Sequence, residues 1–385
     1  MLMYQKMLDI VKSYEDQMIT LLADMVKIPS VSGDEAKLAE FICGYCDSLG
    51  FESSIDRHGN VLVLVKGQKP GKRIAYNNHL DTVPVGEGWT HDPFGAEIID
   101  GKMYGRGSTD CKCGIAAQII AAKALVDSGI PFSGEIALMY PVDEEVQDVS
   151  RKGTLKMLQD GFTADMCVNG EDVDLHCCLV CEGMLEIKIT TMGVGAHGAT
   201  AFEGVNAIGM MCKIYNEIQK IVPAENKYVK GSINPGVIVG GERSSVVPDR
   251  CVMKVSRFTV PGETGAMFLK EVNDIIDKLK AEDPTFNAVA ELTYDTNPSE
   301  VSEDAEVVQA VVKAHEMLGK KCPFYGTPQH DDADFMTNYS NIPTVLYGPG
   351  TGLKAHMPDE YVILDEVREA AQVYSLINYN VLADK

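Results

Sequence analysis

The fold is indicated by the stretch IAYNNHLD at residues 74–81, in which a short apolar run ends in His79 and Asp81. Comparable apolar runs, bounded by glycine, proline and polar residues, occupy residues 61–65, 136–142 and 344–348. Helical patterns lie between them at residues 115–126 and 154–158. Strands that alternate with helices predict an α/β fold, with a mostly parallel sheet flanked by helices.

Histidines and carboxylates follow these apolar runs, where the carboxyl ends of parallel strands collect ligands in open α/β sheets. In chain order these residues are His79, Asp81, Asp110, Asp143, Glu144, Glu145, Glu171 and His356. Two histidines and three carboxylates suffice to hold two divalent metals when one carboxylate bridges them, and this donor set suits zinc, cobalt or manganese. Glu144 would remain beside the metals as a base, which is the inventory of a metal-assisted amide hydrolase.

The composition excludes some partners and favours a soluble protein. The chain has 385 residues with 34 Lys+Arg against 56 Asp+Glu, a formal net charge of -22, and no apolar run long enough to span a bilayer. Nucleic acids and anionic membranes bind basic protein surfaces, so neither is expected as a partner of this acidic chain. The 11 cysteines in a chain without a signal peptide are interpreted as reduced thiols, and a cytoplasmic location is expected.

The N-terminal residues predict an amphipathic helix and not a signal peptide, because acidic residues interrupt the apolar pattern. A second helix that reaches Cys43 and Cys46 follows a loop in which Ser32 or Asp34 is expected to cap it.

A change of pattern near Glu182 predicts a second domain, as the chain length also favours. Alternating and helical stretches follow in the order strand, helix, strand, strand, helix, strand, at residues 185–191, 206–221, 235–240, 251–259, 268–279 and 288–294. We therefore predict a small α+β domain at 182–295, inserted in a catalytic domain formed by 1–181 and 296–385.

An ordered set of motifs resembles the M20 metallopeptidases, a family that includes acetylornithine deacetylase, succinyl-diaminopimelate desuccinylase and carboxypeptidase G. The matching stretches are His79-Leu80-Asp81-Thr82-Val83-Pro84, Trp89…Asp92-Pro93-Phe94, Tyr104-Gly105-Arg106-Gly107-Ser108-Thr109-Asp110, Asp143-Glu144-Glu145, Gly170-Glu171 and Gly348-Pro349-Gly350…Ala355-His356. The resemblance covers nearly the whole chain and implies a zinc-exopeptidase-like fold, whose insert acts as a lid and dimerisation domain.

The resemblance also implies a role for each residue of the site. His79 and Glu171 would bind one metal, Glu145 and His356 the other, and Asp110 would bridge them. Asp81 would orient the His79 ring, and Glu144 would be the general base that activates water at the metals. In the insert, His197 would stabilise the oxyanion, and Arg257 and Ser245 would contact substrate.

These roles predict a two-metal amidohydrolase or peptidase, with zinc the expected metal, acting as a homodimer on an N-acyl amino acid or dipeptide. Two alternatives within the fold are a carbamoyl- or ureido-group hydrolase and a catalytically silent metal-binding homologue. A third is a cysteine-dependent hydrolase using Cys111 or Cys181.

Several further residues receive a structural interpretation from the sequence. Asp143 is expected to hydrogen-bond at a strand end, and Tyr104-Gly105-Arg106-Gly107 to form a turn. The other histidines are interpreted as structural, namely His58, His91, His176, His315 and His330. A group of cysteines is interpreted first as small buried side chains and second as an oxidation-sensitive cluster near the metals, namely Cys111, Cys113, Cys177, Cys178 and Cys181.

Overall fold

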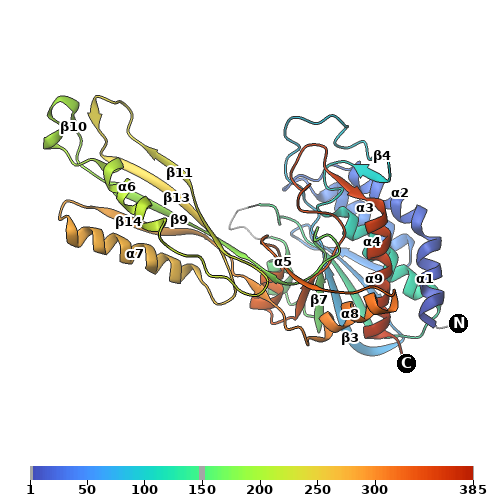
Figure 1. Ribbon diagram of the computed structural model, residues 1–385. Coiled ribbons are helices and arrows are strands. Elements are labelled where there is room, and N and C mark those ends of the chain that lie inside the picture. The colour runs from blue at the N-terminus through green and yellow to red at the C-terminus, as the bar shows by residue number, and fades with distance from the viewer. Residues whose placement is uncertain (1–2, 147–151, 385) are drawn as a thin grey trace. The chain divides into compact units, whose positions relative to one another are not determined.

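The computed structural model describes residues 3–146 and 152–384 (Figure 1). The chain divides into a first unit of Met1–Leu179, Glu300–Tyr325 and Asp331–Lys385, and a second unit of Val180–Ser299 and Gly326–His330. The predicted insert at 182–295 thus begins two residues later and ends four residues earlier than the second unit, and it lacks the segment 326–330. Within the described ranges, no helix has both the length and the apolar character needed to cross a bilayer.

The first unit is built on a nine-stranded sheet that is parallel at its centre. In sheet order the strands are β1 (Glu52–Ile55), β2 (Val61–Lys66), β6 (Ser133–Tyr140), β3 (Lys69–Asn77), β7 (Met166–Asn169), β17 (Thr344–Leu346), β8 (Cys177–Cys181) and β15 (Ser299–Glu300), with β16 (Phe324–Thr327) paired to β8. Strand β3 runs parallel to β6 and β7, and β17 runs parallel to β7. The carboxyl ends of these four neighbouring strands therefore share one edge of the sheet.

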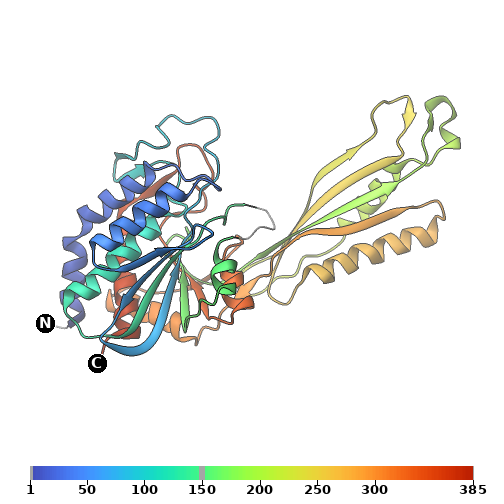
Figure 2. The same ribbon diagram turned by 180° about the vertical axis from the view of Figure 1, so that it is seen from behind.

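Helices cover both faces of this sheet (Figures 1 and 2). They are α1 (Met3–Ser13), α2 (Glu15–Val26), α3 (Ala36–Ser48), α4 (Lys112–Ser128), α5 (Thr154–Gln159), α8 (Glu306–Met317), the short helix η2 (Phe335–Tyr339) and α9 (Leu364–Leu382). Successive strand residues point to opposite faces. Tyr76 stacks edge-on against Tyr374 of α9 with ring centroids 5.3 Å apart, whereas Ala75 packs in a cluster with Met157 of α5 and Met336. The predicted α/β fold class is confirmed.

Two N-terminal predictions are wrong in detail. The first amphipathic stretch forms two helices, because the backbone leaves the helical conformation at Tyr14, whose hydroxyl donates to Asp127 at 2.5 Å. Helix α3 has no side-chain cap, because the Ser32 hydroxyl donates instead to Asp81 at 2.7 Å.

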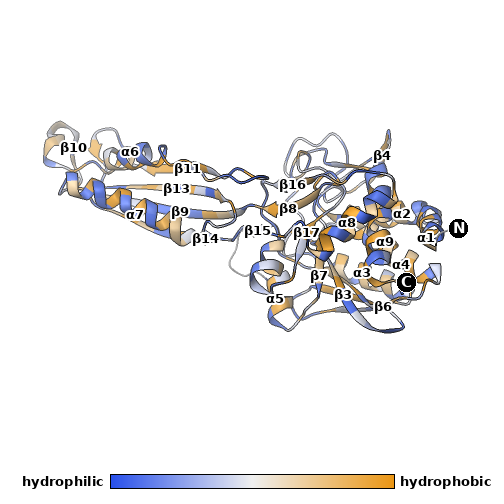
Figure 3. Cartoon of the chain, turned by 60° about the horizontal axis from the view of Figure 1, so that its bottom comes forward, coloured by the Kyte–Doolittle hydropathy of each residue, from blue (hydrophilic) through white to orange (hydrophobic). Residues whose placement is uncertain are grey.

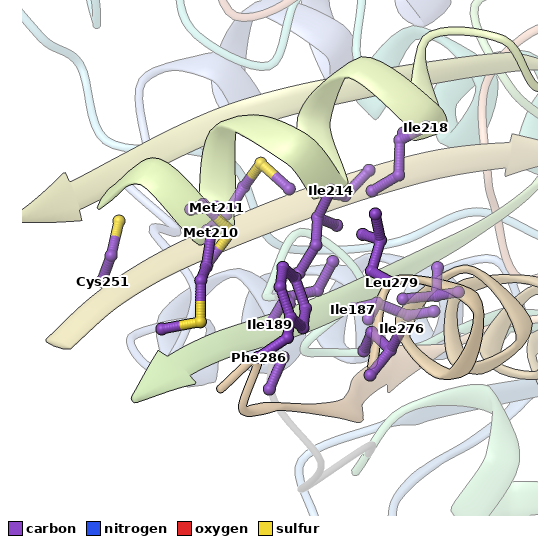
Figure 4. Packing of buried hydrophobic residues seen from close by; sticks show 14 of the residues in the cluster. Ile187, Ile189, Met210, Met211, Ile214, Ile218, Cys251, Ile276, Leu279 and Phe286 are labelled. Atoms are coloured by element: carbon purple, nitrogen blue, oxygen red, sulfur yellow. The ribbon is translucent and has the colours of Figure 1, made fainter. Parts of the chain in front are cut away.

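The second unit has a four-stranded antiparallel sheet in the order β11 (Ser232–Gly240), β13 (Arg250–Thr259), β9 (Gly183–Met192) and β14 (Ala288–Asp295). Helices α6 (Ala207–Ile218) and α7 (Gly265–Glu282) supply its apolar cover, and polar and apolar bands alternate along α7 (Figure 3). Residues from both helices and from the strands share one buried cluster, of which Figure 4 labels Ile187, Ile189, Met210, Met211, Ile214, Ile218, Cys251, Ile276, Leu279 and Phe286. The predicted order of strands and helices is the observed one, with the short strands β10 (Ala196–His197) and β12 (Val246–Val247) and the short helix η1 (Gly198–Glu203) added.

Candidate metal centre

The predicted ligands lie at the edge where the four parallel strands end. His79 follows β3 by two residues, Glu171 follows β7 by two residues, and Glu145 lies in the loop after β6. His356 lies in the loop after β17, and Asp110 lies two residues before the start of α4. The strand order thus brings residues from five distant stretches of the chain to one place.

Among the residues that the structure describes, two groups of candidate ligands have donor atoms within 4.8 Å of one another, and they share Asp110. One group is His79, Asp110, Cys111 and Glu171, and the other is Asp110, Glu145 and His356. Oδ1 of Asp110 is 2.9 Å from His79 Nε2, and Oδ2 of Asp110 is 3.1 Å from His356 Nε2. His356 Nε2 is also 2.9 Å from Oε2 of Glu145. Each oxygen of Asp110 therefore faces a different histidine.

Asp81 holds both the His79 ring and the loop that carries the glutamates. His79 Nδ1 is 2.8 Å from the main-chain oxygen of Asp81 and 3.6 Å from its carboxylate. The Asp81 carboxylate accepts hydrogen bonds from the backbone N–H groups of Glu144 at 3.1 Å and Glu145 at 3.0 Å. The ring is therefore oriented mainly by the backbone of Asp81, while the side chain of Asp81 positions the glutamate loop.

A buried ion pair that the sequence interpretation missed holds the backbone at Asp110. Arg106 Nη1 donates to Glu360 Oε2 at 2.5 Å, and the other Glu360 oxygen accepts from the amides of Thr109 at 3.0 Å and Asp110 at 3.3 Å. The short strands β4 (Glu97–Ile99), β5 (Lys102–Tyr104) and β18 (Tyr361–Ile363) bring these residues together. The stretch around Arg106 thus supports the backbone at Asp110 through charge as well as turn geometry.

The sequence interpretation also missed two buried aspartates of the site, Asp331 and Asp332. The acidic run His330-Asp331-Asp332-Ala333-Asp334 could have indicated them. Asn169 Nδ2 lies 3.5 Å from Glu171 Oε1 and 3.2 Å from Asp331 Oδ1. Asp332 accepts from the Thr154 hydroxyl at 2.6 Å. These contacts fix the polar layer behind Glu171.

The electrostatics of the site fit divalent cations. Burial, together with repulsion from nearby carboxylates, raises the pKa of both Glu144 and Glu171 well above the ordinary value. The carboxylates of Asp110 and Glu145 raise the pKa of His356 to about 10. A cluster this negative attracts positive charge, and a metal at each ligand group would let the carboxylates ionise together. The imidazole and carboxylate donors present are those that zinc, cobalt and manganese accept.

The predicted cysteine cluster is not one group. Cys111 joins His79, Asp110 and Glu171 in the first ligand group, and burial raises the pKa of its thiol. Cys113 is buried and donates to the Thr109 carbonyl at 3.2 Å. Cys177, Cys178 and Cys181 lie instead on β8, and none of them belongs to either candidate ligand group of the described chain.

In the second unit, His197 and Ser245 lie side by side. Strands β10 and β12 pair with His197 opposite Val246, the residue after Ser245, and Gly198 N–H donates to the Ser245 carbonyl at 2.7 Å. Nδ1 of His197 accepts from the Ala199 amide at 3.1 Å, so in a neutral ring Nε2 carries the proton. Both His197 and Ser245 are exposed.

Arg257 is buried within the second unit. Nη1 donates to Glu271 at 2.6 Å, Nη2 donates to Glu263, and the guanidinium lies 4.8 Å from the centre of the Phe268 ring. Before it could hold a substrate carboxylate, Arg257 would have to release one of these acidic partners.

The histidines interpreted as structural make packing and hydrogen-bond contacts. His91 is 2.8 Å from Glu97 and stacks on Tyr104, and His176 stacks on Tyr325 with centroids 3.9 Å apart. His58 accepts from Arg57 at 3.0 Å. His315 donates from Nδ1 to the Val311 carbonyl at 3.0 Å and packs edge-on against Tyr347 with ring centroids 5.4 Å apart.

Fold and site together define an α/β protein with a candidate metal centre. The chain belongs to Peptidase family M20/M25/M40, whose family model matches residues 75–380. This confirms the resemblance drawn from the motifs and makes the protein a hydrolase of amide bonds.

The chain is similar along almost its entire length to curated proteins and solved structures. The uncharacterized protein YgeY of Escherichia coli (strain K12) is 29% identical over 403 residues, covering 99% of this chain and 98% of YgeY. N-formyl-4-amino-5-aminomethyl-2-methylpyrimidine deformylase of Bacillus subtilis (strain 168) is 27% identical over 406 residues, covering 94% of each chain. The crystal structure of aminopeptidase PepT from Bacillus cereus ATCC 10987 superposes with a TM-score of 0.82 at 21% identity, over 95% of this chain and 98% of that one. The likeness to PepT concerns the fold.

Proposed function

We propose that this protein is a two-metal amidohydrolase that cleaves an amide bond in a small substrate, an N-acyl amino acid or a dipeptide. The observation that carries the proposal is the shared aspartate: Oδ1 of Asp110 faces His79 at 2.9 Å and Oδ2 faces His356 at 3.1 Å. A carboxylate placed in this way suits a bridge between two cations. His79 and Glu171 would hold one metal, and Glu145 and His356 the other, with zinc favoured by the donors.

Two bound metals would lower the pKa of the attacking water and polarise the scissile carbonyl. The chain itself then has to move protons. Glu144 belongs to neither ligand group, and its backbone N–H donates a hydrogen bond to the Asp81 carboxylate at 3.1 Å. Its carboxylate would remove a proton from the attacking water and deliver one to the nitrogen of the leaving amine.

His197 is proposed to stabilise the negative oxygen that forms on the substrate carbonyl. Its Nδ1 is occupied by the Ala199 amide, so Nε2 is the nitrogen that can donate a hydrogen bond. Ser245, next to it, is proposed to contact substrate. The second unit would then act as a lid whose closure completes the site.

The proposal is tested by metal stoichiometry on protein purified without oxygen. We expect two metals per chain, falling to one or none in Asp110→Asn and Glu145→Ala. Asp143→Asn is the matched control: Asp143 lies in the same loop but accepts from the Lys152 amide and belongs to neither ligand group of the described residues. Failure of the wild type to take up zinc, cobalt or manganese would contradict the two-metal centre.

A substrate panel separates this activity from its alternatives. We expect hydrolysis of N-acyl amino acids or dipeptides by the metal-loaded protein. Activity confined to N-carbamoyl compounds would make it a ureido-group hydrolase, and bound metal without turnover on any compound would make it a silent homologue. A Cys111→Ser variant that kept its metals and lost turnover would favour the cysteine-dependent alternative.

Assembly and location complete the proposal. The exposed edge strand β11 supports a homodimer formed through the second unit. The net charge of -22 and the free thiols support a cytoplasmic location.

A further inference from the structure

One buried side chain lies between the stretches that carry the first group of candidate ligands. Asn78 directly precedes His79 and is fully buried. Its Nδ2 donates to the carbonyl of Gly170, which directly precedes the glutamate of that group, and at 3.3 Å to the carbonyl of Cys111, which directly follows the shared aspartate. A single side-chain amide thus connects the backbone beside three ligands that lie far apart in the chain.

The hydrogen-bond partners of the Asn78 amide fix the direction in which it faces. The nitrogen of an asparagine side chain carries two N–H donors, and here two main-chain carbonyls accept from it. The side-chain oxygen of Asn78 accepts from Nε2 of Gln118, which lies in α4 and is 1% exposed. A reversed amide would bring its oxygen against two carbonyl oxygens and its N–H groups against a third donor. Gln118 therefore holds Asn78 in the orientation that binds both stretches.

Two glycines leave the space that this amide occupies. A Cβ atom added to Gly170, directly after β7, would overlap the Asn78 oxygen and lie 2.6 Å from Nε2 of Gln118. A Cβ atom added to Gly114, in the first turn of α4, would overlap the Asn78 nitrogen. The amide therefore packs directly on the backbone of both elements, because no side chain comes between them.

The second group of candidate ligands is held in a different way. Among the described residues, no hydrogen bond of the Asn78 side chain ends on the loops that carry Glu145 and His356. The backbone N–H of Glu145 donates instead to the Asp81 carboxylate at 3.0 Å. The two ligand groups thus share an aspartate but depend on different side chains for the position of their backbone.

We propose that Asn78 is a positioning residue for the first metal site, which is formed by His79, Glu171 and the shared Asp110. It acts through the backbone, because its two donors end on main-chain carbonyls next to the ligands. Its role depends on the proposed two-metal centre and makes the two sites unequal. Loss of the amide frees the three stretches from one another and weakens the first site far more than the second.

The test titrates metal-free, full-length protein with zinc in competition with a chromophoric chelator, so that two binding steps are resolved. We expect one step to weaken roughly 10- to 100-fold in Asn78→Ala and the other to stay at its wild-type strength. In a His79→Ala background, which lacks the first site, Asn78→Ala should not weaken the remaining metal further. A further loss of that metal would overturn the proposal.

Asn378→Ala is the matched control. It removes an amide that is 1% exposed and whose oxygen accepts from the Tyr76 hydroxyl at 2.7 Å, away from the ligand-bearing stretches. This variant should lower the thermal midpoint and leave both zinc steps unchanged. If Asn78→Ala weakened both steps equally, or neither, the positioning role would be refuted and the two-metal centre would stand. A wild type that binds no zinc would overturn both proposals.

Gln118→Met provides the second variant should Asn78→Ala fail to fold. It replaces the side chain with one of similar length that lacks the N–H donor to the Asn78 oxygen. The amide of Asn78 then loses its fixed orientation, and the same zinc step should weaken. Two unchanged zinc steps in a folded Gln118→Met protein would contradict the proposal.

Discussion

At the scale of single residues, the candidate site separates groups that would bind metal from a group that would move protons. Asp110, Glu145 and Glu171 lie in the two ligand groups, whereas Glu144 lies in neither. Burial and neighbouring carboxylates raise the pKa of Glu144, which suits its proposed role as a general base.

Glu144→Ala is therefore expected to retain both metals and to lose turnover by roughly 100-fold or more. Metal content and kcat are measured on the same preparation. Glu144→Asp serves as the control, because it keeps a carboxylate at a shifted distance and should retain partial activity. A Glu144→Ala enzyme with near wild-type kcat would refute the assignment of the base.

Glu182 provides a residue-scale prediction about stability in the second unit. It is 2% exposed, its Oε1 has no hydrogen-bond partner, and burial with the nearby charge of Glu263 raises its pKa to about 7. In the unfolded chain the pKa of a glutamate is about 4.3. The folded state therefore binds the Glu182 proton more tightly than the unfolded state does. The contribution of this proton to the free energy of unfolding is complete below pH 4 and is lost as the pH rises through 7.

Glu182→Gln should accordingly stabilise the protein at pH 8 relative to wild type, and much less at pH 4. A shift from 4.5 to about 7 corresponds to on the order of 3 kcal/mol in the free energy of unfolding. Urea denaturation of both proteins across this pH range measures the difference. Equal midpoints at pH 8 would show that Glu182 ionises freely in the folded state.

At the scale of elements, the small sheet of β4, β5 and β18 secures the metal centre through one ion pair. Glu360 precedes β18 and Arg106 follows β5, and both side chains are at most 2% exposed. Removal of Glu360 leaves the charge of Arg106 buried and leaves the amides of Thr109 and Asp110 without their acceptor.

Glu360→Ala should lower the free energy of unfolding by about 3–5 kcal/mol and weaken metal binding. Thermal or urea denaturation and metal titration measure the two effects. The double variant Arg106→Met with Glu360→Leu should be far milder in stability, because no unpaired charge remains. A loss below about 1 kcal/mol in Glu360→Ala would show that the pair does not hold this region.

At the scale of the whole molecule, β11 and β14 are the two edges of the sheet in the second unit. Three consecutive β-branched residues of β11, Val237, Ile238 and Val239, are 45%, 54% and 66% exposed. An unprotected apolar edge is a template for pairing with another chain, which favours assembly through β11.

Ile238→Lys is expected to convert the proposed dimer to a monomer in sedimentation analysis at micromolar concentration. Val289→Lys, at a residue of the opposite edge strand β14 that is 53% exposed, is the matched control and should leave the dimer intact. A monomeric wild type, or equal dissociation of both variants, would exclude pairing through β11.

Much of the architecture could be predicted because the local pattern of apolar and polar residues specifies strands and helices. The apolar run before His79 corresponds to β3, and the alternation after Glu182 corresponds to β9. The resemblance of the motifs to the M20 metallopeptidases indicated the candidate set His79, Asp110, Glu145, Glu171 and His356, whose donor atoms the structure brings within 4.8 Å in two groups.

The sequence by itself determined the types of most elements, because hydrophobic periodicity is a property of neighbouring residues, and its motifs indicated an inserted domain and a candidate ligand set. Only the tertiary structure decided that Asp110 faces both histidines and that Glu360 holds Arg106. These partners are far apart in the chain. They meet only after β6, β3, β7 and β17 pair in parallel and the connecting loops fold over their carboxyl ends, and no local pattern specifies that pairing.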